Sequence, residues 1–349
     1  MTAVGVVERL GAELDRVLDP LVPRGSRCAL LDFPTYHNPG DAAIWLGAEA
    51  WLRRRGADVV YRADLRSFDG AALRRQVRDG IVLLNGGGNF GDLYPAHQRF
   101  RELVLRGAPD NPVIQLPQSV DFTDSRGAQR AKATIEQHAG LTLLVRDHGS
   151  LATAKALFDT DVLLCPDMAF SLGRLEVAAR AETDVLWLLR DDREAVDGRP
   201  RPVAGLVRDW QGATPGSGRW RAPLWAATRA GARLLGSALR GLPPGRPDRL
   251  TGLLFGRIAD EQLDHAVRVL SLGRILVTDR MHGHILGCLL GLPQVLLDSV
   301  TGKVGRYHET WTADIACVRR ATSVAHALEL AHRLAGASQV ARGDGAGRW

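Results

Sequence analysis

Short runs of aliphatic residues alternate along the chain with longer stretches in which apolar residues recur at helical spacing. The first run begins at Cys28, and the alternation continues to Cys165. Apolar runs without polar alternation are typical of strands buried on both faces, so the pattern predicts a parallel sheet covered by helices on both sides. The predicted strands are 28–33, 59–62, 81–85, 113–116, 141–145 and 162–165, and the predicted helices are 42–55, 69–78, 95–106, 125–138 and 150–158.

A second series of elements opens with a predicted strand at 185–189 and is then interrupted. Residues 197–256 are rich in Gly, Pro, Arg and Trp, a composition that disfavours regular strands, although 224–239 fits one amphipathic helix. The rhythm returns with the helix 260–272, the strand 275–278, the helix 283–290, the strand 294–297 and the helix 324–334.

Together the two series predict an α/β fold with two Rossmann-like domains that face a cleft. A chain of 349 residues is longer than one hydrophobic core usually serves, which also favours two domains. We expect an N-terminal domain over 1–175, a C-terminal domain over 183–320 with an insertion near 197–256, and a C-terminal helix and tail over 321–349. Open α/β sheets bind ligands at the carboxyl ends of their strands, so the chemistry is expected there.

Composition narrows the class of protein. Hydrophobic residues make up 45% of the chain and charged residues 24%, as in soluble globular proteins, and no apolar stretch approaches the length of a membrane span. The amino terminus is charged and helical in pattern rather than a signal peptide, which predicts a cytoplasmic protein. The cysteines are far apart in apolar runs and indicate neither a zinc knuckle nor a disulfide framework: Cys28, Cys165, Cys288 and Cys317.

The net charge of +6 comes almost entirely from arginine, because the chain contains only three lysines. A coding bias towards arginine would explain this, and so would anionic ligands, whose phosphate and carboxylate oxygens match the guanidinium fork. Nucleic acid is not an expected partner, because the arginines are dispersed and no DNA- or RNA-binding motif is present.

Two loops after predicted strands of the first series carry candidate chemistry. Asn38-Pro39-Gly40-Asp41 leads into an apolar helix, and Asp41 is expected to cap it; the loop is either a tight turn or a site for an anion or a sugar hydroxyl. The run Gly86-Gly87-Gly88-Asn89 is expected to form a loop that gathers backbone N–H groups around a ligand. It matches neither a Walker loop nor a dinucleotide fingerprint, so ATP and NAD are not indicated.

Arginine and histidine mark two further strand ends. Arg146 is a candidate anion-binding residue, or else forms an ion pair with Asp147 or a neighbour. Arg280 and His282 lie two positions apart at a predicted helix start, where a guanidinium fork and a titratable imidazole meet. His282 and His284 lack a third ligand at suitable spacing, so no metal site is expected.

These segments together resemble the polysaccharide pyruvyl transferase family, particularly its bacterial exopolysaccharide members. The resemblance rests on six motifs in the family's order between Cys28 and about Trp311: 38–44, 86–92, 117–119, Arg146-Asp147 with Ser150, Pro166-Asp167, and 279–283. It implies a fold similar to GT-B glycosyltransferases, and transfer of the enolpyruvyl unit of phosphoenolpyruvate onto two hydroxyls of one sugar. Phosphoenolpyruvate would be a substrate, and no cofactor is expected.

The resemblance also implies roles for individual residues. Arg146, Arg280 and His282 match catalytic and phosphoenolpyruvate-binding positions, with His282 as general acid and base, and Arg190 competes with Arg146 as the second anion clamp. The residues expected to bind substrate are Asn38, Gly40, Asp41, Gly87, Gly88, Asn89, Gln118, Ser119, Met281, His284 and Lys303.

Three other functions stay open at the level of sequence. The same architecture serves glycosyltransferases that use a nucleotide-sugar, and fold alone does not separate the two activities. A degenerate sugar-binding or scaffold member of the family is the second alternative. A nucleic-acid-binding protein is the third, and the dispersed arginines and missing motifs count against it. The acceptor is expected to be a sugar, an oligosaccharide or a lipid-linked glycan. A lipid-linked acceptor would bring the protein to the inner face of the membrane, where the arginine-rich helix 224–239 could dock.

Overall fold

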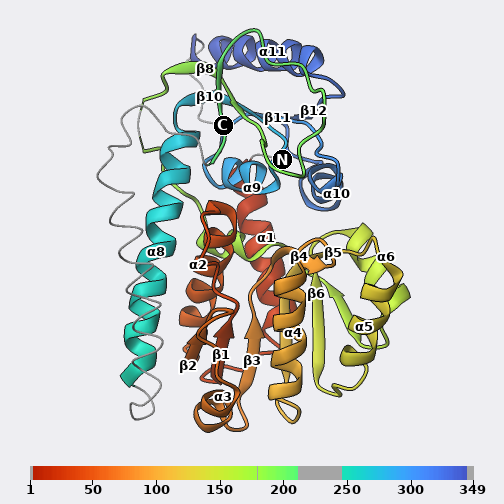
Figure 1. Ribbon diagram of the computed structural model, residues 1–349. Coiled ribbons are helices and arrows are strands. Elements are labelled where there is room, and N and C mark those ends of the chain that lie inside the picture. Colours follow the sequence, from red (N-terminus) through yellow and green to blue (C-terminus); the bar gives the residue numbers. More distant parts are fainter. Residues whose placement is uncertain (1–2, 179, 211–245, 344–349) are drawn as a thin grey trace. The chain divides into compact units, whose positions relative to one another are not determined.

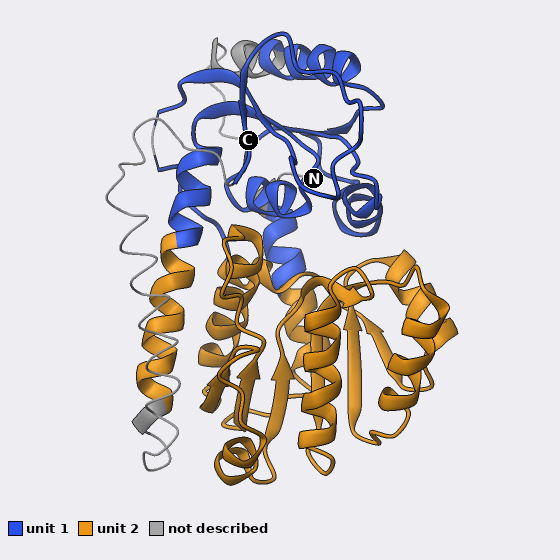
Figure 2. Cartoon of the chain, viewed as in Figure 1, with its two compact units in different colours: residues 1–11, 173–217, 262–349 blue, residues 12–172, 218–261 orange. Residues whose placement is uncertain are grey.

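The computed structural model describes residues 3–178, 180–210 and 246–343 (Figure 1). These residues divide into two compact units (Figure 2). Unit 1 comprises the described residues of Met1–Gly11, Gly173–Ser217 and Gln262–Trp349, and unit 2 those of Ala12–Leu172 and Gly218–Glu261. The division differs from the ranges expected from the sequence because the helices α1 (Ala3–Leu18) and α8 (Arg246–Leu270) each contribute to both units. The predicted helix 224–239 lies outside the described residues.

Unit 2 is built on a parallel sheet, as the aliphatic runs predicted. Among its described residues the strand order is β2-β1-β3-β5-β6-β7, and β4 pairs with β5. All of these pairings are parallel. The strands are β1 (Arg27–Leu31), β2 (Asp58–Ala63), β3 (Ile81–Leu84), β4 (Gly87–Gly91), β5 (Val113–Asp121), β6 (Leu141–Val145) and β7 (Asp161–Leu164).

Helices connect these strands, and most begin at a side-chain cap. The helices are α2 (Pro39–Arg54), α3 (Gly70–Val77), α4 (Pro95–Gly107), α5 (Ser125–Ile135) and α6 (His148–Leu157), followed by the 3₁₀ turn η1 (Met168–Leu172). The cap of α2 is Asn38, whose Oδ1 accepts from the Gly40 backbone N–H at 3.1 Å, so the prediction that Asp41 caps this helix was wrong. Pro39 takes the first helical position, where a missing N–H costs nothing. The helix therefore begins three residues earlier than predicted, and its cap is Asn38.

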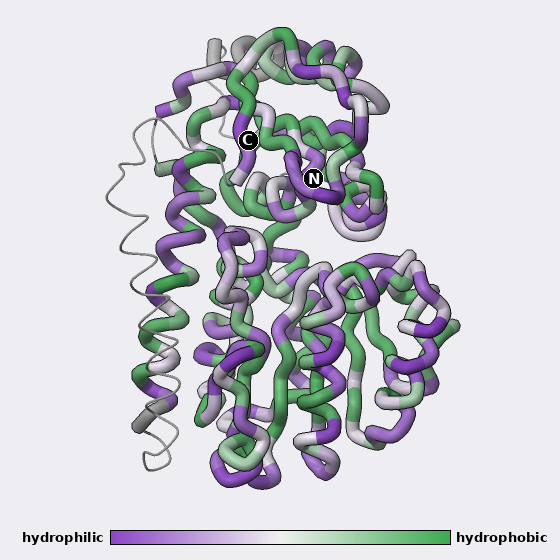
Figure 3. The backbone as a smooth tube through the Cα atoms, in the orientation of Figure 1, coloured by the Kyte–Doolittle hydropathy of each residue, from purple (hydrophilic) through white to green (hydrophobic). Residues whose placement is uncertain are grey.

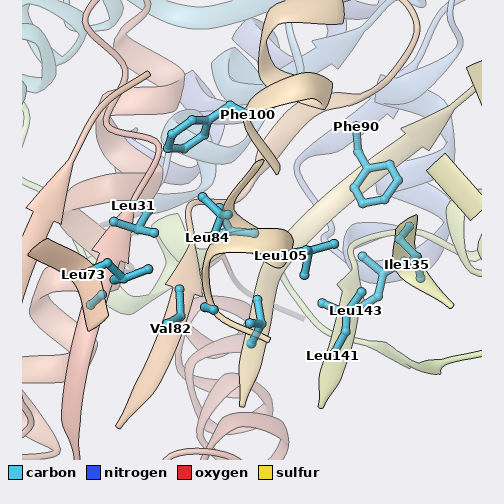
Figure 4. Close-up of a cluster of buried hydrophobic side chains, with 14 of the residues drawn as sticks. Leu31, Leu73, Val82, Leu84, Phe90, Phe100, Leu105, Ile135, Leu141 and Leu143 are labelled. Carbon is cyan, nitrogen blue, oxygen red and sulfur yellow. The ribbon is translucent and has the colours of Figure 1, made fainter. Parts of the chain in front are cut away.

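The core of unit 2 explains why its strands lack polar alternation. Leu31, Val82 and Leu143 point to one face of the sheet, where they pack with Leu73 of α3 and Leu105 of α4 (Figure 4). The strand residues that alternate with them are equally buried: Leu30, Leu83 and Leu144. Both faces of the sheet are therefore covered, and the strands carry the apolar colour along their length (Figure 3).

Unit 1 contains a second parallel sheet, whose described strands follow the order β12-β11-β10-β8-β9. The strands are β8 (Thr183–Leu188), β9 (Leu206–Arg208), β10 (Gly273–Thr278), β11 (Gln294–Leu296) and β12 (Val318–Arg320). Between and after them lie α9 (Met281–Leu289), α10 (Lys303–Tyr307), the π-helical turn η3 (His308–Thr312) and α11 (Val324–Gly343). Trp187, Val277 and Val295 pack with Ala327 and Ala331 of α11 to form its core.

Several boundaries differ from the predicted ones. Helix α8 begins at Arg246, well before the expected start at residue 260, and β5 continues to Asp121, five residues beyond the expected end. Two short strands, β9 and β12, were not predicted. The four cysteines are buried free thiols. Across the described ranges, no helix is long and apolar enough to cross a membrane.

Candidate functional site

The glycine run is a strand rather than an anion-binding loop. Gly87–Gly91 forms β4 and pairs with the extended carboxyl half of β5, Gly87 opposite Gln118 and Gly91 opposite Asp121. Because β5 continues beyond the predicted strand end, this segment pairs with it along one edge, and the Asn89 backbone N–H donates to the Gln118 side chain at 3.3 Å. Gly87 has a φ of +138°, which favours glycine, and a Cβ built there would lie 3.4 Å from Asp41 Oδ1.

Asp41 lies above this strand in the first turn of α2. Its Oδ2 accepts from the Tyr36 hydroxyl at 2.6 Å and from Asn38 Nδ2 at 2.8 Å. Burial, together with the neighbouring Asp41 carboxylate, raises the pKa of Tyr36 well above its usual value, so the hydroxyl stays a donor. Two of the predicted binding residues, Asn38 and Asp41, therefore form one hydrogen-bonded group with a fixed carboxylate.

A histidine that sequence reasoning missed lies beside this group. His97 Nδ1 is 2.9 Å from Oδ1 of Asp32, a buried residue directly after β1, and the Tyr36 ring packs edge-on against the His97 ring. Burial disfavours the imidazolium, but the hydrogen bond and charge of Asp32 outweigh it and raise the pKa of His97. Asp32 has a φ of +68°, the left-handed region that non-glycine residues rarely adopt. An Asp–His pair of this kind orients an acid or base.

Gln118 and Ser119 are both fully buried, and each supports a neighbour. Gln118 Nε2 donates to Asn89 Oδ1 at 3.0 Å, and the Asn89 backbone N–H donates to Gln118 Oε1 at 3.3 Å. Ser119 Oγ accepts from Arg146 Nε at 3.0 Å. Both residues were predicted to bind substrate, and their burial indicates instead that they hold Asn89 and Arg146 in place.

Arg146 is the centre of a buried network. Its side chain is 2% exposed, and Nη1 donates to Asp167 Oδ2 at 2.6 Å. Asp147 caps α6 by accepting from the backbone N–H and the hydroxyl of Ser150, both at 2.8 Å. Five residues of the recognised motifs thus meet in one network. Arg146 forms an ion pair with Asp167, so the expected pairing with a neighbouring carboxylate is present.

In unit 1, Arg280 is held by two carboxylates. Its Nε and Nη2 donate to the two oxygens of Asp209, just beyond β9, and Nη2 also lies 3.3 Å from Asp192 Oδ2. Burial disfavours the Asp209 carboxylate, but the hydrogen bonds and charge of Arg280 prevail and lower its pKa. No hydrogen bond joins Nη1 of Arg280 to any described residue, so this nitrogen can still meet an anion.

Further basic side chains of unit 1 are also paired. Arg190 forms a bidentate pair with Asp192, both contacts at 2.9 Å, and lies 3.1 Å from Glu194 Oε1. Lys303 is buried and lies 3.4 Å from Glu194 Oε2. Asp279 accepts from the backbone N–H of Arg190 at 2.9 Å. The burial and pairing of Lys303 argue against its predicted role as a phosphate contact.

The motif 279–284 contains two histidines with different surroundings. His282 is partly exposed in the first turn of α9. His284 is fully buried, with Nδ1 2.8 Å from the Gln294 amide and Nε2 2.8 Å from Thr312 Oγ1. Burial lowers the pKa of His284 to about 4, so it is a neutral core residue, which argues against its assignment to substrate. Met281 is also buried.

Gly283 explains how the start of α9 is held. A Cβ on Gly283 would lie 2.6 Å from Thr278 Oγ1 and 2.8 Å from the Leu188 side chain, so the helix start packs directly on β10 and β8. Arg280 and His282 are thereby fixed at the carboxyl end of β10. The structure brings together Arg280 and Asp209 within unit 1, and Asn38, Asp41, Asn89 and Gln118 around β4 within unit 2.

Comparison with known proteins identifies the family. A model of the family described as polysaccharide pyruvyl transferase matches residues 38–209. EpsO of Bacillus subtilis (strain 168), which bears the name of a pyruvyl transferase, is 30% identical over 312 residues, covering 89% of this chain and 92% of the relative. The chain belongs to the polysaccharide pyruvyl transferase family. Pyruvyl transferase 1 of Schizosaccharomyces pombe is 32% identical over 300 residues, covering 82% of this chain and 69% of that protein.

Family membership makes the protein a transferase of pyruvyl groups to polysaccharide. A solved structure supports the fold independently. An uncharacterized protein of Klebsiella pneumoniae subsp. pneumoniae NTUH-K2044 is similar with a TM-score of 0.57 at 15% identity, covering 90% of this chain and 99% of that one. Within the described ranges of this polysaccharide pyruvyl transferase, no group of three or more His, Cys, Asp or Glu side chains is arranged to hold a metal ion.

Proposed function

We propose that this polysaccharide pyruvyl transferase moves the enolpyruvyl unit of phosphoenolpyruvate onto two hydroxyls of one sugar, giving a cyclic pyruvate ketal and phosphate. One observation carries the proposal: Asp209 and Asp192 hold the Arg280 guanidinium in place by hydrogen bonds. Arg280 precedes His282 by two residues. The proposal includes two units that face a cleft, as in GT-B glycosyltransferases.

Phosphoenolpyruvate carries a phosphate and a carboxylate, and guanidinium groups bind both through paired hydrogen bonds. Arg280 fits this role because its carboxylate partners fix its plane while Nη1 is left to meet an anion. The backbone N–H groups at the start of α9 add a favourable dipole. Arg146 and Arg190 are two candidates for a second anion contact, and each is held by a carboxylate.

The reaction needs groups that give and take protons. A proton added to the methylene carbon leaves an oxocarbenium-like centre, which the first sugar hydroxyl attacks with loss of its proton. The carbon–oxygen bond to phosphate then breaks, and the second hydroxyl loses its proton as it closes the ring. The proton lost by one hydroxyl thus replaces the proton that was added to form the methyl group, and the proton lost by the other hydroxyl is taken up by phosphate. We assign His282 as general acid and base, with His97, oriented by Asp32, as a second proton carrier.

The acceptor is a sugar in a polysaccharide or its precursor, bound on the unit 2 side by Asp41 and Asn89. The donor already carries the activated pyruvyl group, so the reaction requires no further cofactor. We place the reaction in the cytoplasm, at the inner membrane face where the acceptor is lipid-linked.

Titration calorimetry with phosphoenolpyruvate tests the proposal. We expect binding to the wild type, weakening of at least about 100-fold in Arg280→Ala through loss of charge-assisted hydrogen bonds, and nearly unchanged binding in His282→Ala. Arg319→Ala, which removes an exposed arginine of unit 1, is the matched control. A folded wild type that binds UDP-glucose but not phosphoenolpyruvate would instead support a nucleotide-sugar glycosyltransferase.

A further inference from the structure

Arg101 on α4 is a buried cation with unusual partners. Its side chain is almost fully buried, yet its three nitrogens donate to neutral amide oxygens. Nε donates to Gln115 Oε1 at 2.6 Å, Nη1 to Gln98 Oε1 at 2.8 Å and Nη2 to Asn89 Oδ1 at 3.0 Å. The guanidinium also lies 4.2 Å from the centre of the Phe90 ring. Among the described residues, no carboxylate forms an ion pair with it.

Burying the Arg101 guanidinium without a carboxylate partner lowers the stability of the folded protein. A buried charge is normally paired, and burial lowers the pKa of Arg101 to about 10. The side chain is still charged at neutral pH, and Asp32 and Glu102 favour its charge only from a distance. A leucine at this position would fill the core of α4 without that cost, so the guanidinium is expected to serve something else.

The Arg101 guanidinium fixes the orientation of the Asn89 side chain. Oδ1 of Asn89 accepts from Arg101 and also from Gln118 Nε2 at 3.0 Å, while the Asn89 backbone N–H donates to Gln118 Oε1. Arginine has only donors, so the amide oxygen must face Arg101 and the NH₂ group must face the other way. No described residue accepts a hydrogen bond from that NH₂ group, and Asn89 is partly exposed.

The surroundings of Gly87 on the same strand indicate which kind of ligand group the Asn89 NH₂ donor binds. Gly87, two residues earlier on β4, lies beneath Asp41, whose Oδ2 is filled by Tyr36 and Asn38. Oδ1 of Asp41 has no donor among the described residues. A carboxylate repels an anionic donor substrate but accepts from a hydroxyl, so a fixed amide donor on the strand whose Gly87 contacts this fixed carboxylate matches a sugar hydroxyl.

We propose that Arg101 is a positioning residue, which holds the Asn89 amide so that its NH₂ group donates to a hydroxyl oxygen of the acceptor sugar. This inference rests on the proposed function, because it assigns Asn89 to the acceptor rather than to phosphoenolpyruvate.

The substitution Asn89→Asp separates positioning from stability. The aspartate keeps the shape and both acceptor contacts and gives Arg101 a carboxylate, but it replaces the outward donor with an oxygen. The probe is phosphate release from phosphoenolpyruvate with the best acceptor from p-nitrophenyl β-glucoside, β-galactoside and β-mannoside. We expect the acceptor KM to rise at least about tenfold, while Tm does not fall and phosphoenolpyruvate binding is kept. An unchanged acceptor KM would overturn the proposal.

Arg101→Lys tests whether the arginine acts through Asn89. Lysine keeps the charge but cannot reach three oxygens at once, so we expect the acceptor KM to rise in the wild-type background and to change little further in Asn89→Ala. Arg99→Lys, an exposed position on the same helix, is the control. Equal effects of Arg101→Lys with and without Asn89 would show that it acts elsewhere, as a merely structural residue would.

A separate readout distinguishes failure of this inference from failure of the proposed function. If the wild type releases no phosphate with any acceptor, the pyruvyl-transfer proposal fails for these sugars. The side-chain amide resonances of Asn89, assigned with the Asn89→Ala variant, then test the positioning directly. Arg101→Lys should shift them and speed their hydrogen exchange, and unchanged resonances would overturn the positioning role.

Discussion

Each unit carries a histidine on the helix that follows a candidate site, and the pKa values of the two imidazoles are shifted in opposite directions. In unit 1, neutral groups of Gln294 and Thr312 surround His284, and burial lowers its pKa to about 4. In unit 2, Asp32 binds His97 and raises its pKa despite partial burial. Burial penalises the imidazolium in both places, so the presence of a carboxylate decides the direction in which the pKa of each histidine moves.

The comparison shows what sequence position can and cannot indicate. His284 attracts attention because it lies beside Arg280 and His282, yet it belongs to the core. His97 has no chemical neighbour in the sequence, because Asp32 lies 65 positions away and meets it only in the folded sheet. Three substitutions or pH titrations test this contrast, beginning with the largest expected effect.

Replacing Asp32 by Asn should remove the feature that distinguishes His97. Asparagine fits the site and tolerates the left-handed backbone at Asp32, but it no longer stabilises an imidazolium. We expect phosphate release to fall by about 10² to 10⁴-fold, the range for loss of an oriented acid or base, with phosphoenolpyruvate binding largely kept.

Asp161→Asn, at an exposed position at the start of β7, is the control for that experiment. Activity within a few fold of wild type in Asp32→Asn would show that the charged state of His97 is not used in the reaction.

Because burial lowers the pKa of His284, we expect the protein to lose stability in acid. Its pKa in the folded protein, about 4, lies below the ordinary value near 6.5, so its contribution is complete above pH 6.5 and lost as the pH falls towards 4. The difference corresponds to about 3 kcal/mol of unfolding free energy. Denaturant unfolding of wild type and His284→Gln should show a flatter pH dependence in the variant. His332→Gln, on the exposed side of α11, should behave as wild type; an equally steep loss in His284→Gln would assign the acid sensitivity to other groups.

The parallel sheets were predictable because strands such as β3 and β6 must bury both faces and therefore consist of aliphatic runs. Strand β4 was not, because three of its five residues are glycine and carry no apolar signal. The short strands β9 and β12 contain arginine and resemble loops.

The candidate site was predictable only where its residues are adjacent in the sequence. Arg280 and His282 stand in one motif. Asp209, which orients Arg280, is 71 positions away and lies within the segment 197–256, whose composition is rich in Gly and Pro. Arg101 shows no pattern at all, because its partners are ordinary amides brought together by α4, β4 and β5.

The smallest expected effect is a pH dependence of stability at His97, with the sign opposite to that of His284. The folded pKa of His97 is raised above 6.5, so the stability gained from Asp32 is complete below pH 6.5 and disappears as the pH rises through the folded pKa. The difference in unfolding free energy between wild type and His97→Gln should therefore be larger at pH 6 than at pH 9, when both are measured by denaturant unfolding in the same salt. A difference that is constant or grows with pH would mean that the imidazole is neutral beside Asp32, and the contrast between the two histidines would then rest on hydrogen bonding alone.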